Sequence, residues 1–221
     1  MSIRATPLIE NECYHIYNRG NSKQIIYKDK QDYERFIGLL YACNSSNSLR
    51  IWNISYSDSI FDFKRDEQLV AIGAYVLMPN HFHILLTPLV PNGASLFMQK
   101  VSTAYSMYFN KKYGRSGSLF EGKFKSRHAG DDKYLKYLFS YIHLNPVKMI
   151  DPNWKVNGIK NRKETMHFLS TYPYSSFADF SGIMRKENNI LDLKQFPKYF
   201  PKSKDFEKEI LSWFNTDSDN F

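Results

Sequence analysis

The stretch DDKYLKYLFSYIHLNPVK, residues 131–148, decides the fold, because it predicts one helix with two different faces. At about 3.6 residues per turn, one stripe of this helix is aromatic and polar and consists of Tyr134, Tyr137, Tyr141, Asn145 and Lys148. The neighbouring stripe is apolar and suited to packing, and consists of Leu135, Leu138, Phe139 and Ile142. Asp131 and Asp132 suit the positive start of a helix, whereas Pro146 disfavours helical geometry at Asn145. We therefore expect the helix to end at Asn145, one turn after Tyr141.

Two histidines begin a predicted strand upstream of this helix. Strong strand patterns cover residues 70–78 and 81–87, and Pro79-Asn80 between them favours a tight turn. Residues two apart on a strand point to the same side, so His81 and His83 share a face with Leu85. Two imidazoles on one face can converge on one divalent ion, although a lone H-x-H pattern is weak support for a metal site.

The order of predicted elements indicates an α+β fold. Residues 12–19 form a strand, a helix begins at Asp32, and the two strands above follow. Ser95 caps a second helix, residues 118–126 form the last strand, and the tyrosine helix comes after it. This order predicts a ferredoxin-like split βαβ antiparallel sheet with two helices on one face. The extra helix then closes over the free face and brings Tyr141 to the histidines.

We expect residues 1–150 to form this domain, with 45–68 as an insertion and 151–221 as a C-terminal extension. No apolar run approaches the roughly 20 residues needed to span a bilayer, and the N-terminus lacks the apolar stretch of a signal peptide. A cytoplasmic protein is therefore expected, as a monomer or a homodimer. Cys13 and Cys43 are too few for a disulfide framework or a cysteine-based zinc site.

Positive charge is concentrated around the tyrosine helix. Residues 111–148 hold nine Lys and Arg against three Asp and Glu, which accounts for six of the eight net positive charges. Basic residues interleaved with aromatic ones suit a phosphate backbone whose bases stack on rings. The residues predicted to bind DNA here are Lys111, Lys112, Arg115, Lys123, Lys125 and Arg127. A solvated loop is the alternative interpretation.

The H-hydrophobic-H strand followed by Y-x-x-x-N on a helix resembles the single-tyrosine HUH transposases, most closely the REP-associated tyrosine transposases. The similarity extends to YHIYNRGNSKQIIY at 14–27, YVLMPNHFHILLTP at 75–88, GSLFEGKFKS at 117–126 and YIHLNPVK at 141–148. YPYSSF at 172–177 resembles a short tail motif of the same group. These motifs occur in the family's order and cover most of residues 12–150.

The resemblance implies a site-specific endonuclease and strand transferase that acts on single-stranded DNA beside a hairpin. Tyr141 would be the nucleophile, giving a 5′-phosphotyrosine link and a free 3′-hydroxyl. His81, His83 and Asn145 would hold Mg²⁺ or Mn²⁺, which polarises the scissile phosphate. The resemblance also places Arg19 at the DNA. His15 is left out of the metal site, because a lone strand histidine is more often structural.

Two other functions remain open from the residues alone. A ferredoxin-like module could bind structured single strands without cutting them, although the histidines would then have no role. An ordinary metal nuclease would use water in place of tyrosine as the nucleophile. Only the tyrosine enzyme leaves protein covalently attached to DNA.

Overall fold

The computed structural model describes residues 7–47 and 60–215, and it contains one antiparallel sheet of four strands in the order β2-β3-β1-β4. The strands are β1 (Tyr14–Arg19), β2 (Val70–Met78), β3 (His81–Pro88) and β4 (Lys125–His128). This strand order is that of the predicted ferredoxin-like sheet, so the α+β class is confirmed. Residues 48–59, which lie within the predicted insertion, are outside the described residues.

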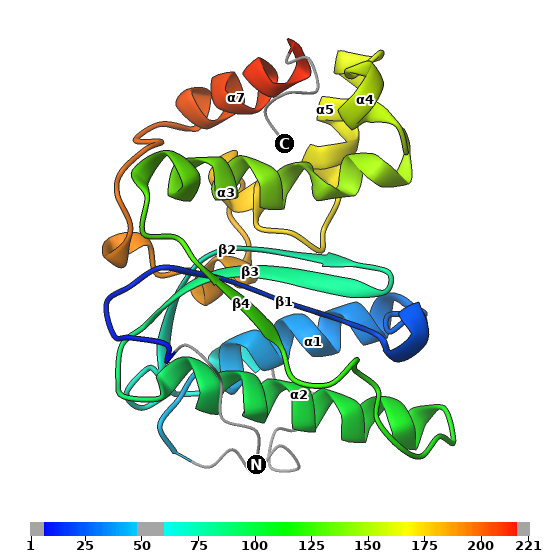
Figure 1. Cartoon of the computed structure of the whole chain (residues 1–221), viewed down its shortest axis with the longest axis vertical. Coiled ribbons are helices and arrows are strands. Elements are labelled where there is room, and N and C mark those ends of the chain that lie inside the picture. Colours follow the sequence, from blue (N-terminus) through cyan, green and yellow to red (C-terminus); the bar gives the residue numbers. More distant parts are fainter. Residues whose placement is uncertain (1–6, 48–59, 216–221) are drawn as a thin grey trace.

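Helices cover both faces of this sheet, as Figure 1 shows. On one face lie α1 (Lys30–Ala42) and α2 (Gly93–Lys112), and on the other lies α3 (Asp132–Leu144). Short 3₁₀ turns connect them: η1 (Asn21–Lys23), η3 (Ile60–Asp62) and η4 (Asn145–Met149). The C-terminal elements are α4 (Trp154–Asn157), α5 (Arg162–Thr171), α6 (Phe177–Phe180), η5 (Lys186–Ile190), η6 (Leu193–Gln195), α7 (Ser203–Ser212) and η7 (Trp213–Asn215).

The alternation of side chains along β3 divides the core into two layers. Phe82, Ile84 and Leu86 are fully buried in the layer formed with α1 and α2. Leu85 is buried in the opposite layer, where the apolar stripe of α3 packs. His83 has the same strand parity as Leu85, so it points toward α3. The fold therefore places the H-x-H pattern under the tyrosine helix.

Two local predictions were wrong. The second helix begins at Gly93 and not at a Ser95 cap, because Asn92 adopts a left-handed conformation with φ of 58°. A Cβ at Gly93 would lie 2.3 Å from the Leu69 carbonyl oxygen, so only glycine fits this start. The last strand covers residues 125–128 and not 118–126, since the positive φ at Gly122 interrupts extended geometry.

The end of α3 lies where the sequence predicted it, with Asn145 as the C-terminal cap, but the expected effect of Pro146 on Asn145 was wrong. The α-helix ends at Leu144, but Asn145 keeps helical angles of −53° and −41° despite the following Pro146. The chain continues directly into the 3₁₀ turn η4, in which Pro146 occupies the first turn. Val147 in this turn is fully buried, so packing overrides the local preference of a residue that precedes proline.

The C-terminal residues share their core with α3 and η4. Leu144 and Val147 are buried together with Trp154, Phe177 and Phe206. In addition, the backbone amide of Leu77 in β2 donates to the Tyr174 carbonyl. The backbone amide of Ser176 donates to the Tyr75 carbonyl. The segment YPYSSF thus lies along the open edge of the sheet. The domain boundary at residue 150 stays a prediction.

Among the described residues, no helix is both long enough and apolar enough to cross a membrane.

Candidate functional site

Helix α3 positions Tyr141 above the sheet. Asp131 caps the helix by accepting a 2.8 Å hydrogen bond from the Tyr134 amide. The apolar stripe is buried against β2 and β3, which turns the aromatic stripe toward β1 and the histidines. The Tyr141 ring lies 5.6 Å from that of His83, measured between centroids. The predicted nucleophile and one predicted ligand are therefore neighbours, although 58 residues separate them.

The two site histidines, His81 and His83, lie at the start of β3. Their ring centroids are 5.1 Å apart and their planes nearly perpendicular. His83 is 7% exposed and His81 is half-buried. His81 Nδ1 lies 2.7 Å from Asn80 Oδ1, and the Asn80 amide nitrogen donates to the Lys23 carbonyl. Because a carboxamide oxygen only accepts, His81 carries its proton on Nδ1, and Nε2 keeps a lone pair for a ligand.

Burial keeps both site histidines neutral. It lowers the pKa of His81 to about 4, with help from the charges of Lys148 and Arg19. Burial also lowers the pKa of His83 well below its ordinary value, and the neighbouring histidines and lysines add to this effect. Neutral imidazole is the form that binds a metal ion. The chemistry of the pair therefore fits a cation site.

Asn145 completes the predicted ligand set at the C-terminal end of α3. It is 5% exposed, and its amide nitrogen donates to the Tyr141 carbonyl at 2.8 Å. This bond fixes the amide and leaves its oxygen to act as a ligand. Within residues 7–47 and 60–215, no group of three or more His, Cys, Asp or Glu could hold a metal ion. A metal at this site therefore depends on an amide oxygen beside the two histidines.

Tyr141 belongs to a row of stacked rings along α3. Tyr134 and Tyr137 stack at 6.0 Å, and Tyr137 and Tyr141 stack at 5.6 Å. Tyr137 also packs on Trp213 of η7. Burial raises the pKa of Tyr141, whereas the Asn145 side chain opposes this rise. The phenol is therefore protonated at neutral pH in the free protein.

The structure brings two further residues to the site that sequence reasoning missed. His15 of β1 lies with its Nε2 2.8 Å from His83 Nδ1, so it is a direct partner of one site histidine and not a lone structural residue. Lys155 of α4 places its Nζ 4.8 Å from the centre of the Tyr141 ring. Burial and the charge of Lys148 lower the pKa of Lys155 to about 8. The parity of β1 could have indicated His15, whereas nothing local to α4 indicates Lys155.

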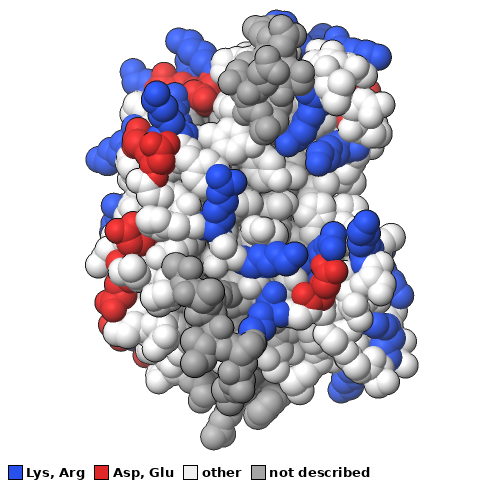
Figure 2. Space-filling model, in the orientation of Figure 1, with Lys and Arg blue, Asp and Glu red and all other residues white. Residues whose placement is uncertain are grey.

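Three of the predicted DNA-binding residues lie on the sheet face that carries the site. On β4, Lys125 pairs with Tyr17 and Arg127 with His15. On β1, Arg19 pairs with His81, and its guanidinium bonds Glu121. Directly paired residues of neighbouring strands share a face, so these cations and the histidines point to the same side. Figure 2 shows Lys and Arg side chains across the middle of the molecule, over the region where β4 lies in Figure 1.

The other predicted DNA-binding residues lie elsewhere. Lys123 is exposed in the segment before β4, while Lys111 and Lys112 end α2 beneath the other face of the sheet. Lys112 is bound at 2.8 Å to both Asp29 and Asp32, which ties α2 to the start of α1. Arg115 lies 5.6 Å from the Phe109 ring. The basic residues between 111 and 127 are therefore divided between the sheet face that carries the histidines and the face covered by α2.

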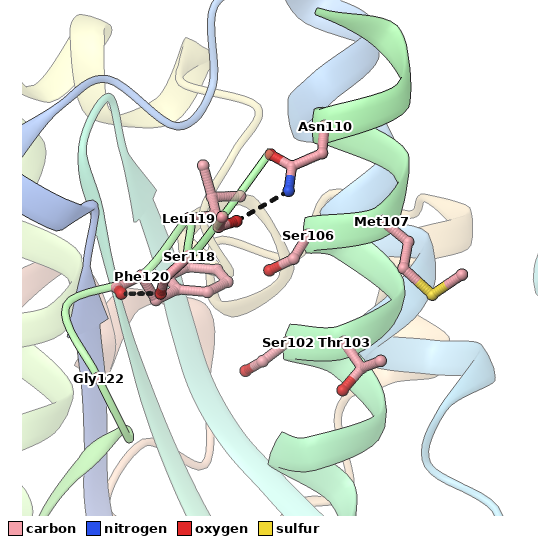
Figure 3. Close-up of a pocket in the computed structure, with 10 residues that line it drawn as sticks. Ser102, Thr103, Ser106, Met107, Asn110, Ser118, Leu119, Phe120 and Gly122 are labelled. Atoms are coloured by element: carbon pink, nitrogen blue, oxygen red, sulfur yellow. Dashed lines mark hydrogen bonds between the residues drawn. The ribbon is translucent and has the colours of Figure 1, made fainter. Parts of the chain in front are cut away.

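An open groove of about 370 Å³ lies between α2 and residues 117–122, away from the histidines. Hydroxyl groups of Ser102, Thr103 and Ser106 line it, and Asn110 closes one end by donating to the Gly117 carbonyl (Figure 3). None of the predicted catalytic or metal-binding residues lines this groove. The candidate site is instead the surface between α3 and the sheet.

Comparison with known proteins assigns the chain to a family. No curated protein matches the chain significantly. A solved structure described as a REP-associated tyrosine transposase bound to a REP hairpin is similar over 90% of this chain and 98% of its own, with 16% identity and a TM-score of 0.49. A family model for IS200-like transposases matches residues 14–145, a range that includes the site histidines, Tyr141 and Asn145. The chain therefore belongs to the IS200-like transposase family.

Proposed function

We propose that this transposase is a site-specific single-stranded DNA endonuclease and strand transferase that uses Tyr141 as its nucleophile. The observation that carries the proposal is the position of Tyr141, 5.6 Å from His83 on the aromatic stripe of a helix that closes over the sheet. A phenol held this way is presented to a phosphodiester that lies between the helix and the histidines. Family membership supports DNA as the substrate.

In the proposed reaction the Tyr141 oxygen attacks the scissile phosphorus and the bond to the 3′ oxygen breaks. The phenol proton is lost and the departing 3′ oxygen gains one, so the products are a 5′-phosphotyrosine and a free 3′-hydroxyl. One phosphodiester replaces another, so the break can be rejoined to a second 3′ end without ATP. Because burial raises the pKa of Tyr141, the site must supply positive charge as the phenol loses its proton.

The chain holds suitable groups for this charge. Lys155 lies beside the Tyr141 ring, and Lys148 is close enough to lower the pKa of both site histidines. We propose that His81, His83 and Asn145 hold Mg²⁺ or Mn²⁺, which would polarise a phosphate oxygen of the substrate when bound. Neutral imidazoles and a fixed amide oxygen fit such an ion. Lys125 and Arg127, on the same face, are proposed to contact the phosphates of the incoming strand.

The nucleophile is tested with labelled single-stranded oligonucleotides that tile the DNA flanking the gene, including its hairpins. Covalent adducts are detected as a labelled band that survives denaturing electrophoresis. Tyr141→Phe should abolish the adduct and leave binding nearly unchanged, because it removes one oxygen and keeps the ring. Tyr137→Phe is the matched control, since it makes the same change one turn away in the same stack. If Tyr141→Phe still forms the adduct and Tyr137→Phe does not, the nucleophile is Tyr137 and the assignment of Tyr141 is wrong.

The same assay tests the metal. Excess chelator and alanine at either site histidine should suppress adduct formation, whereas Asn145→Ala should weaken it less. An amide oxygen is the weakest of the three ligands, and water can partly replace it. Full activity in chelator would exclude the metal. Cleavage that yields free 5′-phosphate ends without any adduct would instead indicate a nuclease in which water attacks.

A further inference from the structure

A third imidazole lies directly behind one of the site histidines. His15 Nε2 is 2.8 Å from His83 Nδ1, and the ring centroids are 5.0 Å apart. The two residues are 6% and 7% exposed, so water has little access to the bond between them. The His15 ring also meets the edge of Tyr141 at 5.8 Å. His15 therefore contacts both the proposed ligand and the proposed nucleophile.

Strand register creates this arrangement. Tyr17 of β1 pairs with His83, and His15 lies two residues before it, on the same face. On its other side, His15 pairs with Arg127 of β4. Because the two ring nitrogens are 2.8 Å apart, one of them carries the hydrogen and the other accepts it. Burial and the charge of Arg127 lower the pKa of His15, in agreement with a neutral ring.

A hydrogen bond between two neutral imidazoles needs one donor and one acceptor, so the pair has two possible tautomer arrangements. If His15 donates, His83 carries its proton on Nε2, and that nitrogen cannot bind a cation. If His83 donates from Nδ1, its Nε2 keeps the lone pair. Only the second arrangement is compatible with the proposed metal site.

We propose that His15 is a positioning residue whose Nε2 accepts a hydrogen bond from His83 Nδ1 and so holds the His83 ring with its own Nε2 free for the metal. This inference rests on the proposed function, because it presupposes His83 as a ligand. Each site histidine then has its own acceptor. The Asn80 carboxamide oxygen fixes His81, and the His15 imidazole fixes His83. Partners of this kind set ligand orientation, and their loss typically weakens metal binding by about 10- to 100-fold.

The test measures Mn²⁺ binding to the full-length protein by calorimetry, without DNA. His15→Phe keeps an aromatic ring but removes the acceptor, so its affinity should fall by about 10- to 100-fold. His15→Gln, which can still accept through its side-chain oxygen, should lose less. Tyr17→Phe is the matched control, because it removes a polar atom from the adjacent ring on the same face and should bind Mn²⁺ as the unaltered protein does. Cleavage by His15→Phe should recover at saturating Mn²⁺.

Nitrogen-15 NMR of the metal-free protein gives a second readout that does not depend on the stability of a variant. His83 should carry its proton on Nδ1, and a proton found on Nε2 would overturn the proposal. Unaltered Mn²⁺ affinity in His15→Phe, with affinity lost in His83→Ala, would also overturn it while leaving the proposed metal site intact. If neither His81→Ala nor His83→Ala weakens Mn²⁺ binding, the proposed metal site is wrong and the role of His15 is refuted with it.

Discussion

Ser176 joins the C-terminal tail, the edge strand β2 and helix α3 through one hydroxyl group. Its Oγ accepts a 2.9 Å hydrogen bond from the Tyr75 amide of β2 and lies 2.7 Å from His143 Nε2. His143 Nδ1 lies 2.8 Å from the Phe139 carbonyl, which can only accept, so Nδ1 carries the proton of the neutral ring. Ser176 therefore donates to Nε2. The side chains of Ser176, Tyr75 and His143 are fully buried.

Ser176→Ala would leave a backbone amide and an imidazole nitrogen without partners in the protein interior. Each unsatisfied buried group costs about 1–3 kcal/mol, so the free energy of unfolding should fall by about 2–6 kcal/mol. That loss is a large part of the stability of an ordinary domain, which is about 5–15 kcal/mol. Because His143 lies two residues after Tyr141, the loosened helix should also form less adduct per molecule of folded protein.

Urea denaturation measures the loss, with Ser170→Ala as the control. The Ser170 hydroxyl is exposed and donates to the His167 carbonyl one helical turn earlier, so its removal should cost no more than about 0.5 kcal/mol. The double variant Ser176→Ala/His143→Leu should lose less stability than the two single changes added together, because they remove partners of the same bond. A Ser176→Ala variant as stable as Ser170→Ala would refute the role given to this hydroxyl.

Two further predictions concern salt and pH. Binding of single-stranded DNA should weaken with salt, and Lys125→Ala/Arg127→Ala should flatten the log–log slope by about 1.4. Lys30→Ala/Lys64→Ala, which removes one charge from the start of α1 and one exposed charge from the loop before β2, should leave the slope unchanged. An unchanged slope in the first pair would place the DNA elsewhere. Burial lowers the pKa of His143 to about 3, so the unfolded chain binds a proton below pH 6.5 that the folded one excludes. Stability should therefore fall as pH drops from about 6.5 toward 3, at about 1.4 kcal/mol per pH unit from this residue, and a flat urea midpoint between pH 6 and pH 4 would contradict it.

Periodic patterns predicted the parts of the site that depend on which face a residue occupies. The alternation along β3 placed His81 and His83 on one side, and the helical period placed Tyr141 on a stripe next to the apolar residues of α3. The extra helix could be expected over the free sheet face because an apolar stripe must be buried somewhere. These inferences need only the period of the element and the order of elements along the chain.

The residues that sequence reasoning missed depend on contacts between distant segments. His15 becomes a partner of His83 only because β1 lies beside β3 in the register that pairs Tyr17 with His83. Lys155 reaches Tyr141 because the buried Trp154 anchors α4 against the end of α3. Asn145 stays helical before Pro146 because Val147 is buried. In each case tertiary packing sets a geometry that the local residues do not encode.

The segment that follows α3, here called the extension, helps to position Tyr141 through the sheet edge. Tyr174 and Ser176 accept and donate backbone hydrogen bonds along β2, so YPYSSF covers an edge that would otherwise expose unpaired amides. The same segment binds His143 of α3, while Phe177 and Phe206 bury the end of that helix. Helix α3 packs on one side against the sheet and on the other against residues that follow it in the chain. The orientation of Tyr141 over the histidines is therefore fixed jointly by the sheet and by the extension, since neither holds both sides of the helix alone.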